Sequence, residues 1–367
     1  MIEDKKQLPT ICIVHSPLRD ATAPYTSPLA AISIKNKVMK TRKNKLLIVA
    51  LLIIPSWLTM CLAQETNSIR IVDSLSKLEL VFHDGFFTEG PAVDRDGMVY
   101  FSDVTLTQYS GMQAGHIWRY NPDDNQTALF RSPSGMANGI IFDLDGNMVI
   151  AQGADFGGRC IIRTNMVTGK SEIIAGLYDG KSLNAPNDLV IDEKGQIYFT
   201  DPRYYGHEPV EQPVMGVYRI NLDGSLDRII EHAGTPNGIL ISPDQKYLYV
   251  ASCNYPYWSS LNALIRFELD DDGKVKNRQI LIDFNGTLGP DGMAIDQDGN
   301  LYLTRHGDNP GIHVFSPEGT KLDYIATPEE PSNVTFGRGK TENFLFITAG
   351  KNLYKIKVNT KGYFPSK

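Results

Sequence analysis

Cysteine is scarce in this sequence, with four residues among 367. Only Cys160 and Cys253 lie beyond residue 63, too few for a disulfide-stapled secreted scaffold. Basic residues are also outnumbered, because 36 Lys and Arg face 42 Asp and Glu. Residues 1–63 hold nine basic and three acidic residues, so the remainder carries 27 against 39, a net charge of −12. We therefore expect no nucleic-acid partner, since phosphate binding needs a basic face.

Long apolar runs are missing too, and the most prominent one lies near the N-terminus, from Leu46 to Met60. Its length of about 15 residues is short for a membrane span, which needs ~20. A basic run precedes it and Cys61-Leu62-Ala63 follows it, which is the arrangement of a secretory signal peptide. We predict cleavage near Ala63 and export, periplasmic or secreted, with no membrane attachment afterwards. An uncleaved membrane anchor is the alternative.

The leader divides the chain into two parts. Residues 1–63 are assigned to an N-terminal extension and signal peptide. Because a signal peptide begins near the start of a chain, Met39, next to the basic run, is an alternative start to Met1. Residues 64–367 are assigned to the folded domain.

No clear amphipathic helix interrupts the rest of the sequence, and five of its segments share one pattern. Each segment reads as a short strand, a tight turn rich in Asp and Gly, and a strand rich in β-branched and aromatic residues, which is typical of a β-hairpin. The equivalent turn positions, spaced 49, 49, 50 and 54 residues apart, are Asp94, Asp143, Asp192, Ser242 and Asp296. A looser sixth copy begins at Val334.

Six hairpin-rich repeats of ~50 residues predict an all-β fold, a six-bladed β-propeller whose blades are four-stranded sheets around a channel. A first strand near residues 69–72 or 78–82 would complete the last blade and close the ring without free edges. The repeats lack the signatures of WD and kelch propellers. The Asp-x-Asp-Gly turns also lack the Glu that an EF-hand needs at its twelfth position, so we interpret them as structural turns.

A polar residue opens the first strand of each repeat, a few residues before the turn. In a propeller these positions meet in one ring at one mouth of the channel. Carboxylate and amide oxygens are hard ligands, so the ring predicts one divalent cation, calcium first, with magnesium, manganese and zinc as alternatives. The alternative to a cation site is a structural role, in which the Asn and Asp side chains only cap turns. The six positions are Glu89, Asn138, Asn187, Asn237, Asp291 and Asn333.

At these residues the sequence resembles the senescence marker protein/gluconolactonase/regucalcin family of six-bladed propellers. The resemblance runs from about Glu89 to Tyr363 and depends on the order and spacing of several short motifs. These are Glu89-Gly-Pro, Ala185-Pro-Asn-Asp-Leu-Val, Tyr198-Phe-Thr-Asp-Pro, Thr235-Pro-Asn-Gly with Ser242-Pro-Asp, and Gly289-Pro-Asp-Gly-Met-Ala-Ile-Asp.

In that family a divalent cation sits at the channel mouth, and the members of known activity are mostly lactone hydrolases. The resemblance implies that Glu89, Asn237 and Asp291 are metal ligands and that Asn187 is a further ligand or a substrate contact. It also implies that Asp291 donates and accepts the catalytic proton. Animal members carry an arginine two residues before the matching asparagine, where this chain has Ala185. Their sugar specificity is therefore not carried over.

Loops at the same mouth supply further candidates. His306 is the candidate for a second catalytic group, as base or substrate contact. Asn138, Tyr205 and Arg305 are candidate substrate contacts, because aromatic and basic side chains suit a polyhydroxylated or anionic ligand. For the tyrosine, packing between blades is the alternative. The segment of Tyr255, Tyr257 and Trp258 follows another strand at this mouth.

These observations predict a metal-dependent hydrolase that opens the ring of a small-molecule lactone, with a sugar lactone as the first choice. One alternative is a propeller without enzymatic activity, in which a metal stiffens the channel and the top face binds a partner. Another keeps the metal and changes the substrate to a different ester or a phosphotriester.

Overall fold

The computed structural model describes residues 70–73, 75–112, 115–254 and 261–366. The predicted signal peptide and the segment of Tyr255, Tyr257 and Trp258 lie outside these residues. Within them, no helix has the length and apolar character to cross a membrane.

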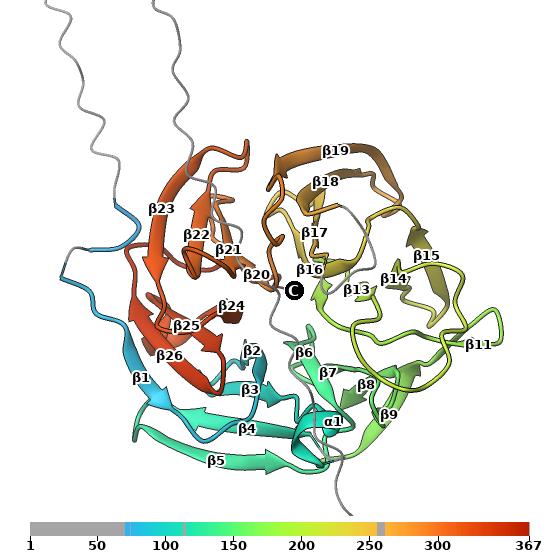
Figure 1. The fold of residues 1–367 in the computed structure, drawn as a ribbon, viewed down its shortest axis with the longest axis horizontal. Helices are drawn as coiled ribbons and strands as arrows, with labels where there is room; N and C mark the ends of the chain where they lie inside the picture. The colour runs from blue at the N-terminus through green and yellow to red at the C-terminus, as the bar shows by residue number, and fades with distance from the viewer. Residues whose placement is uncertain (1–69, 74, 113–114, 255–260, 367) are drawn as a thin grey trace, which may run out of the picture. The chain divides into compact units, whose positions relative to one another are not determined.

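Six four-stranded antiparallel sheets surround a central axis, which confirms the predicted six-bladed propeller (Figure 1). Each sheet is called a blade and is numbered in chain order, with its innermost strand given first. Blade 1 consists of β2 (Thr88–Val93), β3 (Val99–Asp103), β4 (His116–Asn121) and β5 (Gln126–Arg131). Blade 2 consists of β6 (Ala137–Phe142), β7 (Met148–Gln152), β8 (Cys160–Thr164) and β9 (Ser171–Ala175). Blade 3 consists of β12 (Leu189–Ile191), β13 (Ile197–Asp201), β14 (Gly216–Ile220) and β15 (Leu226–Ile230).

The second half of the chain repeats the arrangement. Blade 4 consists of β16 (Pro236–Ile241), β17 (Tyr247–Ser252), β18 (Ala263–Leu269) and β19 (Val275–Asp283). Blade 5 consists of β20 (Met293–Ile295), β21 (Leu301–Arg305), β22 (Gly311–Phe315) and β23 (Lys321–Ala326). Blade 6 consists of β24 (Pro331–Phe336), β25 (Phe344–Ala349), β26 (Asn352–Lys357) and β1 (Glu79–Phe82). Outside the blades lie α1 (Thr107–Ser110), the 3₁₀ turn η1 (Gly339–Thr341) and the short hairpin of β10 (Leu177–Tyr178) and β11 (Lys181–Ser182).

The repeated turns join the first two strands of the blades by one local mechanism. In the first repeat, Asp94 Oδ1 accepts hydrogen bonds from the backbone N–H groups of Asp96 and Met98, both at 2.9 Å. Gly97 follows with φ 87°, a left-handed conformation that glycine adopts without strain. The same carboxylate-to-backbone pattern recurs at Asp143, Asp192 and Asp296. The interpretation of the Asp-x-Asp-Gly segments as structural turns is confirmed.

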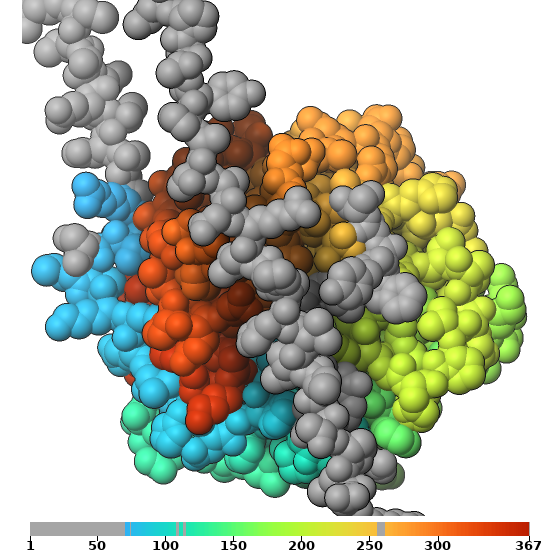
Figure 2. Space-filling view, in the orientation of Figure 1, coloured from blue at the N-terminus to red at the C-terminus, as the bar shows by residue number. Residues whose placement is uncertain are grey.

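The ring is closed by the first strand of the described chain. β1 pairs with β26 through Glu79 opposite Lys355, Leu80 opposite Tyr354 and Phe82 opposite Leu353. Figure 2 shows the result in space-filling form, with the blue N-terminal segment lying against the red and orange C-terminal blades. Of the two candidate closing strands in the sequence, the one near residues 78–82 therefore completes blade 6.

Neighbouring blades are held together by large side chains buried between them. Tyr100 of blade 1 packs edge-on against Phe142 of blade 2, with ring centroids 5.4 Å apart. Tyr302 of blade 5 packs in the same way against Phe336 of blade 6, at 4.9 Å. Aromatic pairs of this kind add stabilisation to the apolar area they bury. The inner strands are therefore fixed in place, and so are the residues that precede them.

Candidate active site

A cavity of about 360 Å³ opens at one mouth of the channel, and most of the predicted site residues line it. The residues come from the starts of the innermost strands and from loops that follow the second strands. Those among the predicted site residues are Glu89, Asn138, Asn187, Tyr205, Asn237, Asp291 and His306.

Backbone hydrogen bonds between the inner strands define which residues share one level of the channel. Gly139 N–H donates to the carbonyl of Asn187 at 2.7 Å, and Gly238 N–H donates to that of Asp291 at 3.2 Å. In the same position, Gly292 N–H donates to Ser332 at 2.8 Å. The sixth member of the ring is therefore Ser332. The expectation of Asn333 at this position was wrong by one residue, because the sixth repeat has Ser332-Asn333 where the other repeats have Glu, Asn or Asp followed by Gly or Asp, so that its asparagine takes the second of the two positions.

The four predicted metal ligands lie together on the floor of this cavity. Glu89, Asn187, Asn237 and Asp291 are all buried and all line the cavity. Asn237 Nδ2 donates a hydrogen bond to the hydroxyl of Tyr204 at 3.1 Å, and the Asn237 side chain also hydrogen-bonds to the Asp291 carboxylate. The side-chain carbonyl oxygen of Asn237 is therefore left to coordinate a cation. Rigid orientation of a ligating side chain by its neighbours strengthens metal binding.

The floor concentrates negative charge in a buried place. Burial raises the pKa of Asp291 to about 6, and burial together with the charge of Asp291 holds the pKa of Glu89 well above its usual range. Burial likewise raises the pKa of Asp188, the next residue after Asn187, to about 7. Like charges that cannot reach water destabilise one another, and a cation at the same place reverses this cost.

The donor set fits a hard divalent cation. Two carboxylates with amide oxygens match the all-oxygen coordination that calcium prefers, whereas zinc favours nitrogen and sulfur ligands. Across the described ranges, no three His, Cys, Asp or Glu side chains gather closely enough to hold a metal by themselves. The asparagine oxygens of Asn187 and Asn237 are therefore required for such a site.

A second level of the channel lies directly beneath the ring and consists of four glycines and two polar residues. Asp188 and Asn333 belong to it, and the Asn333 side chain hydrogen-bonds to both Glu89 and Asp188. A Cβ on Gly292 would lie 2.0 Å from the Asn333 side chain, and one on Gly139 would lie 2.7 Å from Asp188 Oδ1. Glycine at these positions leaves space for the side chains of Asn333 and Asp188, and Asn333 hydrogen-bonds to Glu89. The members of the level are Gly90, Gly139, Asp188, Gly238, Gly292 and Asn333.

His306 follows β21 and stands beside Asp291. Its Nε2 lies 3.5 Å from Asp291 Oδ2 and 3.1 Å from the carbonyl of Pro331. Its Nδ1 lies 3.9 Å from the Glu330 carboxylate. The imidazole therefore bridges the floor and the wall of the cavity, within reach of any group held by Asp291.

The remaining predicted contacts divide into two groups. Asn138 and Tyr205 line the cavity. Arg305 does not: its guanidinium donates to Thr287 Oγ1 at 2.8 Å and to the Leu288 carbonyl at 3.3 Å, and it lies 4.3 Å from the centre of the Phe284 ring. Its role as a substrate contact stays a prediction.

Two residues with clear roles in the site could not be identified from the motifs. The Tyr204 hydroxyl accepts a hydrogen bond from Asn237 and donates one to the carbonyl of Cys253 at 3.3 Å. The buried Asp201 carboxylate accepts the N–H groups of Asn184 and Ala185, both at 2.8 Å, and thereby fixes the loop that leads to Asn187. An Asp before Pro reads equally well as a turn residue, so only the structure reveals this function.

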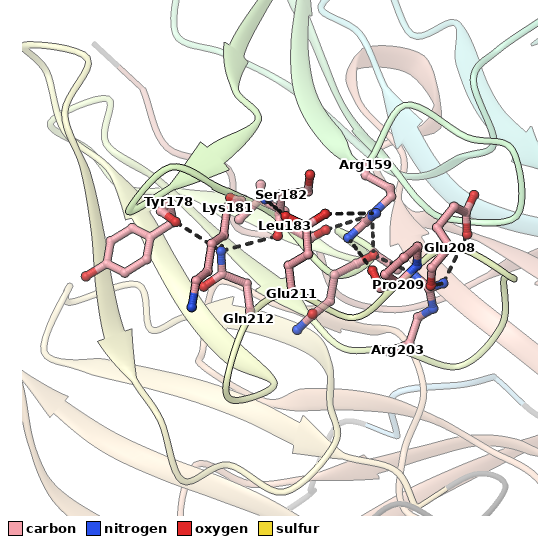
Figure 3. A network of polar contacts seen from close by, with 12 residues as sticks. Arg159, Tyr178, Lys181, Ser182, Leu183, Arg203, Glu208, Pro209, Glu211 and Gln212 are labelled. Atoms are coloured by element: carbon pink, nitrogen blue, oxygen red, sulfur yellow. Dashed lines mark hydrogen bonds and ion pairs between the residues drawn. The ribbon is translucent and has the colours of Figure 1, made fainter.

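The loop between β13 and β14, which carries Tyr204 and Tyr205, is anchored by charged side chains (Figure 3). Arg203 pairs with Glu208 at 3.0 Å. Arg159 donates to the carbonyls of Leu183 at 2.8 Å and Pro209 at 3.1 Å. Gln212 donates to three carbonyls of the β10–β11 hairpin. The wall of the cavity on this side is therefore held by several independent contacts.

Comparison with known proteins agrees with this geometry. The profile of the SMP-30/gluconolactonase/LRE-like region matches residues 87–351. A gluconolactonase of Zymomonas mobilis is 33% identical over 320 residues, covering 80% of this chain and 84% of the relative. Lactonase drp35 of Staphylococcus epidermidis is 31% identical over 251 residues, covering 66% and 70%.

Solved structures show the same fold. A gluconolactonase from Xanthomonas campestris superimposes with a TM-score of 0.67 at 28% identity, covering 79% of this chain and 91% of that one. Regucalcin from Agrobacterium tumefaciens, at 16% identity, superimposes with a TM-score of 0.64 over 79% and 96%. The chain belongs to the SMP-30/gluconolactonase/LRE-like family.

Proposed function

We propose that this chain is a metal-dependent hydrolase that opens the ring of a lactone to give the hydroxy acid. The observation that carries the proposal is the floor of the cavity, where two buried carboxylates and two asparagine oxygens converge beside His306. The names of the gluconolactonase and lactonase relatives support the same class of reaction. Gluconolactone is the first sugar lactone to test.

Glu89, Asn187, Asn237 and Asp291 would hold the cation. When bound, a divalent cation polarises the lactone carbonyl and stabilises the negative charge that develops on its oxygen. Calcium suits the all-oxygen donor set best.

The chain's own groups handle the proton. Asp291 holds a water molecule and takes a proton from it as the water oxygen adds to the carbonyl carbon. The ring C–O bond then breaks, and the proton passes to the leaving oxygen. His306, 3.5 Å from Asp291, and Glu89 are placed to share the proton. Tyr204 keeps the Asn237 amide turned so that its oxygen faces the cavity.

The test uses the chain from Gln64, stripped of metal and reloaded with calcium, magnesium, manganese or zinc. Proton release is followed across sugar lactones, aliphatic lactones, simple esters and a phosphotriester. We expect hydrolysis of lactones that returns with a cation. Hydrolysis confined to esters or phosphotriesters, or none above the spontaneous rate, would overturn the proposal.

Asp291→Asn provides the matched variant. We expect at least about a 100-fold loss of kcat, the lower end of the contribution of a general base. Asp123→Asn, which changes an exposed carboxylate paired with Lys340, is the control and should retain full activity. Retained activity in Asp291→Asn would remove this residue from the mechanism.

A further inference from the structure

Much of the cavity lining is apolar, and six of its apolar residues are together called the apolar wall. Above the polar floor, the side chains come from the loops after β3 and β7, from the segment before β6 and from the connections that precede β2 and β20. These residues are Phe87, Val104, Leu106, Met136, Ala154 and Leu288. These six side chains therefore offer van der Waals contact, whereas groups suited to a carbonyl or a hydroxyl come from the floor and from the polar lining residues Asp155, Tyr205 and Glu330.

Two residues of this wall adopt a backbone conformation that their side chains disfavour. Leu106 has φ 43° and Met136 has φ 56°, both in the left-handed region where glycine and asparagine are the usual residues. Strain of this kind persists where the surrounding structure holds it, and it gathers at functional sites. Met136 is only 2% exposed. Apolar side chains thus stand at two wall positions where local backbone preference opposes them.

Two exposed aromatic residues are adjacent in sequence to cavity residues. Phe156 follows the cavity residue Asp155, has φ 67° and is 49% exposed. Phe86, next to the cavity residue Phe87, is 39% exposed. A substituent long enough to reach either residue would meet exposed aromatic surface there.

The charged groups around the cavity do not suit an anion. Among the described lining residues there is no Lys or Arg, because Arg305 is turned to Thr287 and Leu288. The Asp155 carboxylate accepts the N–H of Thr107 at 2.6 Å. An anionic ligand would meet carboxylates here, and any sugar hydroxyl that lay against the six apolar residues would be buried against carbon without a partner, which is costly.

We propose that the preferred substrate is a neutral lactone that carries an apolar substituent, and that Leu106 and Met136 select it. The inference rests on the proposed lactone hydrolysis and narrows its substrate class. The ring carbonyl lies at the polar floor, and the substituent lies along the wall toward Phe156. This orientation removes the substituent from water and leaves the reacting carbonyl beside Asp291.

The test compares six-membered lactones that differ only in their substituent: δ-valerolactone, δ-hexalactone, δ-octalactone, δ-decalactone and glucono-δ-lactone. A fully buried methylene changes kcat/KM about fourfold. Since burial is incomplete near the rim, we expect δ-decalactone to exceed δ-valerolactone by at least about 50-fold. We also expect it to exceed glucono-δ-lactone by at least about tenfold.

Leu106→Asn and Leu106→Gly remove the apolar side chain while keeping a residue that accepts the left-handed backbone. We expect either variant to lower the ratio of kcat/KM for δ-decalactone to that for δ-valerolactone by about tenfold. We expect an unchanged or raised Tm in Leu106→Asn, because asparagine relieves the strain. Leu222→Asn, which changes a 70% exposed leucine in a turn, is the control and should keep the ratio of the parent.

The outcomes separate the two proposals. Hydrolysis of no lactone with any cation overturns the proposed function and this inference with it. If lactones are hydrolysed but glucono-δ-lactone is preferred, or kcat/KM does not rise with the length of the alkyl substituent, the proposed function stands and the proposed substrate class is overturned. If kcat/KM rises with alkyl length and the ratio for δ-decalactone over δ-valerolactone is unchanged in both Leu106 variants, the assignment of selectivity to this wall is overturned. If that ratio falls in both Leu106 variants and is unchanged in Leu222→Asn, the inference is supported.

Discussion

Phe82→Ala probes the closure of the ring. Phe82 is 7% exposed and packs between blades 6 and 1, with its ring 5.2 Å from that of Phe101 and 4.9 Å from that of Trp118. Truncating a buried phenylalanine costs about 3–5 kcal/mol of unfolding free energy. For a domain of about 300 residues the unfolding entropy is roughly 0.6 kcal/mol per kelvin, so the expected fall in Tm is about 5–8 °C.

Leu80→Ala is the matched control because it truncates a neighbour on the same strand. Leu80 is 51% exposed, and its backbone pairing with Tyr354 does not depend on the side chain. We expect a loss below about 1 kcal/mol. The two variants are compared by thermal and urea unfolding. Equal, small losses would show that β1 does not close blade 6 in solution.

Four further predictions concern the channel, the loop above it and the leader. Saturating calcium at 100 times its Kd should raise the unfolding free energy by about 2.7 kcal/mol over the chelated protein, and an unchanged Tm in calorimetry would argue against a folded-state site. Tyr204→Phe removes the acceptor of the Asn237 amide and should weaken calcium binding by about tenfold in titration calorimetry. An unaltered Kd would show that Tyr204 does not orient this ligand. Gly292→Ala places a Cβ 2.0 Å from Asn333 and should lower the free energy of unfolding by urea by about 1–3 kcal/mol. Gly176→Ala is the control and should not lower it, because the nearest atoms are 3.5 Å away. Equal effects of the two variants would refute the steric argument. The mature chain isolated after export should begin near Gln64 by N-terminal sequencing, and a mature chain that begins at Met1 or Met39 would disprove cleavage.

Much of the fold could be predicted because each repeat carries its own local signal. The Asp turn fixes where one strand ends and the next begins, so the spacing of Asp94, Asp143 and Asp192 reports the blade length directly. Blade 6 has a degenerate copy, in which the asparagine lies one position after the ring position, and the prediction was wrong by one residue there. Residue type alone does not reveal this offset, which is visible in the backbone hydrogen bond from Gly292 of the neighbouring blade to Ser332.

The floor of the site could be predicted better than its walls. Glu89, Asn237 and Asp291 occupy equivalent positions in blades 1, 4 and 5, so propeller symmetry brings them together. The direction of a loop side chain follows no such rule. Arg305 directly precedes the cavity residue His306, yet it does not line the cavity, and its guanidinium hydrogen-bonds to the Thr287 hydroxyl and the Leu288 carbonyl. The role of Tyr204 depends on a loop anchored by residues from other blades, Arg159 and Cys253.

The closure of blade 6 makes the order of synthesis matter. β1 is the first strand of the described chain to leave the ribosome, and β26, its partner, is the last. Until residues 353–355 have been made, the nascent chain can assemble blades but leaves β1 with an unpaired edge, the kind of edge that promotes misassociation. A chain that terminates before Asn352 therefore cannot complete the ring. Closure therefore depends on synthesis through β26, because blade 6 is complete only when β26 is present to pair with β1.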